Sequence, residues 1–238
     1  MIYYFIVGIT VLLSIIVNTI LKNKFRDYSK LYLHSCISGK EIAEKMLADH
    51  GIYDVNVLSV EGELTDHYNP INKTINLSEK VYNYSTAASV AVAAHECGHA
   101  LQHRLGYNLL KLRNHLIPIL NFSSKFINLA IISGLTIFYN SGGNNSLILK
   151  LGIGLFFLVV IFSLITLPIE FDASNRALTW LRNKNVVNYQ EYRKTRESLN
   201  LAAMTYVISA LGCLTQLIYF LSVFTGSSNS SSGRDEHF

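Results

Sequence analysis

Two histidines four residues apart, with a glutamate after the first, form the pattern in this sequence with the clearest chemical meaning. The segment reads His95-Glu96-Cys97-Gly98-His99. Residues i and i+4 of a helix lie on one face, one turn apart, so both imidazoles can bind a single metal ion. In sites of this kind the glutamate acts as general base, and zinc lowers the pKa of a bound water to about 7. The spacing therefore predicts a Zn²⁺ site with ligands His95 and His99 and base Glu96.

The residues around this motif predict the helix that it requires. Residues 85–106 contain no proline and are rich in alanine, with Ser85 placed to cap the start and Gly106 placed just past the end. Gly98 costs a helix about 1 kcal/mol relative to alanine, so we expect it only where a second helix or a substrate approaches closely. Cys97 lies about 200° around the helix from His95, so we expect it to pack rather than to react.

A catalytic zinc ion needs a third protein ligand and one open position. The HExxHxxGxxH pattern is excluded, because Gln102 and Leu105 stand where it has glycine and histidine. His103 lies about 80° around the helix from His95 and could approach the metal only awkwardly.

Glu170 is the better candidate for the third ligand. It follows an apolar segment that ends near Pro168, and two membrane crossings return it to the side of the HExxH segment. The alternative is structural: a helix that begins at Pro168 would favour an acidic residue in its first turn, because of the helix dipole.

Composition and hydropathy indicate a membrane protein. Half of the 238 residues are hydrophobic and 15% are charged, against about 25% in ordinary soluble domains. Apolar segments long enough to span a bilayer occupy residues 2–21, 116–138, 147–168 and 201–225. The first has no basic residue before it and no small-residue cleavage site after it, so we expect a retained anchor. The fold class predicted is mainly α: about four transmembrane helices with a small α+β catalytic region.

The basic residues predict which side of the membrane carries the site. Segments 22–115 and 169–200 hold 17 of the 20 lysines and arginines, and four spans place both on one side. By the positive-inside rule this side is cytoplasmic. There is no dense basic run, so nucleic-acid binding is not expected. The three cysteines (Cys36, Cys97 and Cys213) form no CxxC pair, which indicates a reducing compartment without a disulfide framework.

The two segments between the spans have some readable structure. Residues 38–51 read as a short amphipathic helix, and residues 55–60 and 73–77 read as strands around a turn at Asn69-Pro70. Residues 169–200 carry the candidate third ligand. The polar residues 226–238 are typical of a disordered tail.

Taken together, these motifs resemble the YugP-type membrane zinc metallopeptidases of bacteria. The resemblance rests on LTDHYNP (64–70), TINLS (74–78), AAHECGHALQ (93–102) and LPIEFDAS (167–174), and it covers nearly the whole chain except the tail. It implies a gluzincin-like core with ligands His95, His99 and Glu170, base Glu96, and a bacterial cell membrane. The chain is more distantly similar to the HtpX and CAAX-prenyl membrane proteases. Where HtpX-like enzymes carry an aspartate four residues after the ligand glutamate, this chain has Ser174.

Supporting roles are less determined by spacing. Ser174 or Asp172 could hydrogen-bond a ligating histidine from behind, a contact whose loss costs about 10–100-fold in affinity or activity. An oxyanion stabiliser is also needed. His67, Tyr68 and Arg176 are candidates, and spacing does not choose among them.

Three functions are compatible with the sequence. The first is a zinc-dependent endopeptidase that cleaves membrane or membrane-proximal proteins, with peptide substrates adding to the edge of a strand. The second is a catalytically inert membrane scaffold with a metal site, which would have no need of Glu96. The third is a small transporter using Lys125 and Glu170, which the absence of internal repeats disfavours. The sequence therefore favours the endopeptidase.

Overall fold

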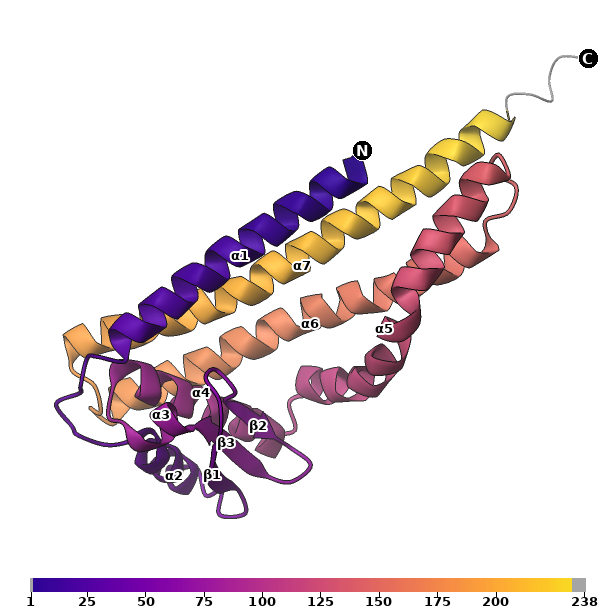
Figure 1. The fold of residues 1–238 in the computed structure, drawn as a ribbon. Helices are drawn as coiled ribbons and strands as arrows, with labels where there is room; N and C mark the ends of the chain where they lie inside the picture. Colours follow the sequence, from indigo (N-terminus) through magenta and orange to yellow (C-terminus); the bar gives the residue numbers. More distant parts are fainter. Residues whose placement is uncertain (1, 233–238) are drawn as a thin grey trace, which may run out of the picture. The chain divides into compact units, whose positions relative to one another are not determined.

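The computed structural model describes residues 2–232 and is mainly helical. These residues form seven helices and one three-stranded sheet (Figure 1). The chain divides into two compact units. One comprises residues 112–165 with the parts of the chain up to residue 14 and from residue 207, and the other comprises residues 15–111 and 166–206.

Four helices are long and apolar enough to cross a membrane. They are α1 (Ile2–Tyr28), α5 (Asn108–Asn140), α6 (Leu147–Asn183) and α7 (Tyr189–Ser232). The four candidate spans predicted from the sequence thus lie in four separate helices. Because their apolar residues have large exposed surfaces in the isolated chain, these helices are suited to a lipid environment.

The long helices extend beyond the predicted spans, and two expectations change as a result. Pro168 lies inside α6 and does not begin a helix, so Glu170 is a residue of the helix interior and the helix-dipole explanation for it does not apply. The end of residues 169–200 likewise forms the start of α7. That helix continues to Ser232, whereas a disordered tail was expected from residue 226; residues 233–238 lie outside the described part.

The unit that contains residues 112–165 is held together by close packing between helices. Its buried cluster includes Ile131, Phe138, Leu149 and Phe220. Gly134 of α5 lies against the backbone of Leu149 in α6, where a Cβ would come within 2.7 Å of the Leu149 nitrogen. Small residues at such crossings let membrane helices pack closely.

The other unit contains a small mixed sheet and three shorter helices. Strands β1 (Asn56–Val60) and β3 (Thr74–Ser78) pair in parallel, and β2 (His67–Asn69) pairs antiparallel with β3 at the sheet's edge. Helices α2 (Gly39–Asp49), α3 (Glu79–Asn83) and α4 (Ala87–Arg104) pack together and against this sheet (Figure 1). Both predicted strands are present; β2 and α3 were not predicted.

Local signals explain where α2 and α4 begin and end. Ser38 and Glu41 form a capping box at the start of α2, with each side chain accepting from the other residue's backbone N–H. The cap of α4 is Thr86, one residue after the predicted Ser85, and its hydroxyl accepts from the Ser89 N–H. Gly106 follows α4 with φ +68°, the left-handed conformation expected of a residue just past a helix end.

Candidate metal centre

Helix α4 and helix α6 bring the three predicted metal ligands together. One ligand atom from each of His95, His99 and Glu170 lies within 4.8 Å of the other two. The Glu170 Oε2 atom is 3.2 Å from His95 Nε2 and 3.5 Å from His99 Nε2. The Glu170 side chain is 4% exposed, so a carboxylate and two imidazoles converge at a nearly buried point.

The spacing of these donors fits a zinc ion. Ligands about 2.0–2.2 Å from a tetrahedral ion lie roughly 3.3–3.6 Å from one another. The two nitrogen–oxygen separations here are close to that range. Two histidines and one glutamate also form the protein ligand set of several catalytic zinc sites, which leave the fourth position open. The donor set and two of its three separations therefore suit a zinc ion.

Gly98 allows α4 to approach α6 closely enough for this convergence. A Cβ at Gly98 would lie 2.5 Å from the backbone oxygen of Ala173, much closer than real Cβ contacts. Gly98 lies between the two histidines in α4, and Ala173 lies one turn after Glu170 in α6. The expectation that Gly98 marks a close approach is confirmed, and the approaching element is a helix.

A polar side chain contacts the Nδ1 atom of each histidine, the ring nitrogen that points away from Glu170. The Ser174 Oγ atom lies 3.1 Å from His95 Nδ1, and the Gln102 Oε1 atom lies 3.0 Å from His99 Nδ1. Both rings therefore direct Nε2 toward Glu170. The structure places Ser174 where the sequence suggested a supporting contact; Gln102 was not foreseen.

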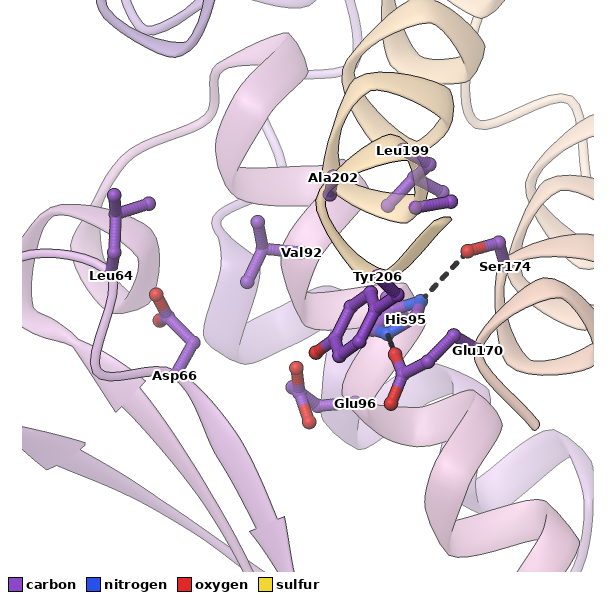
Figure 2. Close-up of a pocket in the computed structure, with 11 residues that line it drawn as sticks. Leu64, Asp66, Val92, His95, Glu96, Glu170, Ser174, Leu199, Ala202 and Tyr206 are labelled. Carbon is purple, nitrogen blue, oxygen red and sulfur yellow. Dashed lines mark hydrogen bonds and ion pairs between the residues drawn. The ribbon is translucent and has the colours of Figure 1, made fainter. Parts of the chain in front are cut away.

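Glu96 lines a pocket beside the cluster. The pocket is also lined by His95, Glu170, Ser174 and Tyr206, the last of which comes from α7 (Figure 2). Figure 2 shows Glu96 directed into the same space as Glu170, with the hydroxyl end of Tyr206 pointing toward Glu96. Glu96 is 7% exposed overall, so its carboxylate faces the pocket rather than open solvent.

Burial and charge alter several pKa values near the pocket. Burial opposes a charge on His99, but the Glu170 carboxylate beside it outweighs this effect and raises the pKa of His99. Burial also raises the pKa of Asp66, a pocket residue that accepts hydrogen bonds from the Ser78 N–H at 2.7 Å and the Ser78 hydroxyl at 3.0 Å. Burial raises the pKa of the Cys97 thiol well above its usual value, which favours an inert, packed thiol.

The other predicted candidates lie outside the pocket lining. His67 contacts the Thr65 carbonyl and Asn76. The Tyr68 hydroxyl is 2.7 Å from His103 Nδ1, and burial raises the pKa of Tyr68 to about 12. His103 is thus engaged by β2 and is not part of the metal cluster.

Asp172 and Arg176 form a polar pair that contacts Gln102 and not the metal ligands directly. The Arg176 Nε–H donates to Asp172 Oδ2 at 2.6 Å, and Gln102 Nε2 donates to the same oxygen at 2.8 Å. Asp172 therefore reaches His99 only through Gln102. This arrangement fits a supporting contact for Asp172, whereas Arg176 does not face the pocket as an oxyanion stabiliser would.

Three residues of the site escaped the sequence analysis. Gln102 lies three residues after His99, so helical spacing alone placed it on the same face and could have identified it. Asp66 and Tyr206 are brought to the pocket by a loop and by α7, respectively. No local spacing relates either residue to the HExxH motif.

Comparison with known proteins agrees with this geometry. Residues 3–225 match the family described as "Putative neutral zinc metallopeptidase". The chain is 40% identical over 216 residues to "Putative membrane protease YugP" of Bacillus subtilis (strain 168), covering 91% of each chain. No solved structure matches it. The match spans nearly the whole chain and includes both helices that carry the two histidines and the glutamate. The chain therefore belongs to this neutral zinc metallopeptidase family.

Proposed function

We propose that this protein is a zinc-dependent membrane endopeptidase that hydrolyses peptide bonds of membrane or membrane-proximal proteins. One observation carries the proposal: the convergence of His95, His99 and Glu170 beside a pocket that Glu96 lines. A structural zinc site needs four closed protein ligands and no adjacent base. This cluster has three candidate ligands and a carboxylate next to them.

His95, His99 and Glu170 would hold the zinc ion. When bound there, zinc lowers the pKa of a coordinated water to about 7 and polarises the substrate carbonyl. The protein supplies the geometry: Ser174 and Gln102 orient the two imidazoles, and the tight Gly98–Ala173 crossing keeps Glu170 beside them.

We assign Glu96 the role of general base and then general acid. Its carboxylate accepts one proton from the attacking water as the water oxygen bonds to the scissile carbonyl carbon. The same carboxylate delivers this proton to the amide nitrogen as the carbon–nitrogen bond breaks. The products are a carboxylic acid and an amine, and Glu96 returns to its ionised form.

We assign Tyr206 the role of donor to the oxygen that becomes negatively charged during attack. The carboxylates that line the pocket only accept hydrogen bonds when ionised, and the Ser174 hydroxyl lies at His95 Nδ1, on the side of the ring away from Glu170. A phenol keeps its proton at neutral pH and can donate. Tyr206 replaces His67, Tyr68 and Arg176 as the candidate because it lines the pocket and they do not.

We further propose that the site faces the cytoplasm of a bacterial cell. The four candidate spans support a membrane location, and the clustering of basic residues in segments 22–115 and 169–200 supports the orientation. A substrate would then be cleaved at the cytoplasmic boundary of the bilayer.

Purified full-length protein in detergent tests this function. Wild-type protein loaded with zinc should cleave a casein-like substrate, and Glu96→Gln should retain stoichiometric zinc while losing cleavage by several orders of magnitude. His95→Ala should lose zinc. Equal cleavage by wild type and Glu96→Gln would refute the assignment of Glu96. Zinc binding without cleavage of any substrate would instead favour the inert scaffold.

A further inference from the structure

The pocket beside the candidate metal centre has an apolar side. Leu64, Val92, Leu199, Ala202 and Ala203 are the apolar residues of its lining, and the whole pocket has a volume of about 160 Å³. Leu199 and Ala203 are 3% and 4% exposed, so this part of the pocket is closed off by the core of the unit. Figure 2 shows Val92 of α4 and Ala202 and Leu199 of α7 on the same side of His95.

The size of the cavity suits one side chain. An apolar cavity of about 150 Å³ engineered in another protein accommodates benzene. The whole pocket, catalytic side included, has about this size, so its apolar part, walled by two alanines and a valine, has room for at most one leucine or phenylalanine side chain.

The charge of the lining excludes acidic side chains. Asp66, Glu96 and Glu170 line the pocket, and its lining as described contains no lysine or arginine. When zinc is bound it would offset the charge of Glu170, but a substrate carboxylate placed beside Asp66 and Glu96 would still face two acidic groups, and its burial there would be costly.

We propose that the apolar side of this pocket is the specificity subsite of the enzyme and takes a leucine or phenylalanine side chain next to the cleaved bond. The inference rests on the proposed peptidase function. The wall formed by α7 sets the size of the accepted side chain, and Ala202 is the alanine of this wall that is only partly buried. Acidic residues at that substrate position are rejected.

Fluorogenic peptides carrying leucine, phenylalanine, alanine, lysine or aspartate on either side of the cleaved bond test the subsite. Leucine should exceed alanine in kcat/KM by about 10–200-fold at one position, the range for small apolar differences. Ala202→Phe should reduce this preference at least tenfold. Val92→Ala should shift the preference toward phenylalanine. Met204→Phe is the matched control: Met204 lies on α7, is 44% exposed and does not line the cavity.

The same peptides give a binding measurement that does not require cleavage. Zinc-loaded Glu96→Gln protein should bind the leucine peptide more tightly than the aspartate peptide, and Ala202→Phe in that background should remove the difference. An unchanged preference after Ala202→Phe, or a preference for aspartate, overturns the subsite. A preference in binding without any cleavage by wild type would instead refute the peptidase function alone.

A second inference comes from the hydrogen bonds of Gln102, whose side chain is fully buried. Its Nε2 group donates to the Ile169 carbonyl at 2.8 Å and to Asp172 Oδ2 at 2.8 Å. Both amide hydrogens are therefore committed to oxygen acceptors. This fixes the orientation of the amide, so Oε1 must face His99 Nδ1 at 3.0 Å.

An amide oxygen can only accept a hydrogen bond, so His99 must carry its proton on Nδ1. The neutral ring then presents the Nε2 lone pair to the point where Glu170 lies. The Arg176 guanidinium pairs with Asp172 and completes the support on the other side of the amide. Ile169 directly precedes Glu170 in α6. The Gln102 side chain therefore contacts both helices that carry metal ligands: His99 in α4 and the backbone of α6.

We infer that Gln102 is a positioning residue that selects the metal-binding tautomer of His99. It touches neither substrate nor metal. Its effect is on zinc affinity, which can be measured independently of peptide cleavage.

Two variants separate the tautomer effect from simple packing. Gln102→Leu removes both the acceptor and the donors and should weaken zinc binding by about 10–100-fold. Gln102→Glu combined with Asp172→Asn keeps an acceptor for His99 Nδ1, avoids two facing carboxylates because the amide introduced at position 172 can donate to the carboxylate at position 102, and should restore most of the affinity. Competition with a chromophoric chelator gives the affinities, and the melting temperature of metal-free protein controls for folding. Equal losses in both variants, or no loss in either, would overturn the inference.

Discussion

The backbone oxygen of Ala173 in α6 lies where a Cβ on Gly98 in α4 would come within 2.5 Å of it. This contact lies between the two candidate histidine ligands and one turn beyond the candidate glutamate ligand. Helix separation and metal geometry are therefore coupled at a single residue, since any side chain at position 98 must push α4 away from α6.

Gly98→Ala should weaken zinc binding and destabilise the fold. Overpacking typically costs about 1–3 kcal/mol, which exceeds the roughly 1 kcal/mol that alanine gains over glycine in a helix. The separation of His95 and His99 from Glu170 should lower zinc affinity at least tenfold by chelator competition. Gly154→Ala in α6 is the control, because a Cβ there meets no atom within 4 Å. Wild-type affinity in Gly98→Ala would disprove the coupling.

Tyr206→Phe should lower kcat by about 10²–10³-fold, the typical cost of removing one donor to an oxyanion. Zinc affinity and KM should change little, because the phenol is proposed to act on the charge that develops during attack. A phosphonate transition-state analogue should lose affinity in parallel with kcat/KM. Tyr189→Phe is the control, since Tyr189 is on the same helix and 78% exposed. A rise in KM alone would assign Tyr206 to substrate binding instead.

Removal of the metal should destabilise the unit that contains α4 and the sheet. A ligand that binds only the folded state stabilises it by about 2.7 kcal/mol at one hundred times its dissociation constant. Excess chelator should therefore lower the melting temperature, and zinc should restore it. Mg²⁺ should not, because it prefers oxygen ligands in octahedral geometry. His95→Ala protein should show no shift with either treatment, and a zinc-dependent shift in that variant would contradict the ligand assignment.

The proposed orientation predicts the labelling of a native cysteine. Cys36 is exposed and lies in the basic segment 22–115, so a membrane-impermeant maleimide should label it only after cells are lysed. A cysteine introduced at Asn144, in the link between α5 and α6, should be labelled in intact cells. The reverse pattern would place the candidate site outside the cell.

The sequence by itself determined the parts of this protein that depend on local spacing and local composition. His95 and His99 share a helix face because they are four residues apart, whatever surrounds them. Four apolar runs predicted four long helices because hydropathy is a property of each segment. Glu170 was predicted as the third ligand from a single long-range argument: two membrane crossings return the chain to the side of the HExxH segment.

Only the tertiary structure decided the rest. Pro168 lacks a backbone N–H and was expected to begin a helix, yet α6 continues through it. Asp66 and Tyr206 reach the pocket from a loop and from α7, and no periodicity relates those segments to α4. Gln102 was visible at helical spacing, but its role depends on acceptors from α6 that only the folded chain supplies. Spacing along one helix determines which residues share a face, whereas the partners of that face are set by how separate segments pack.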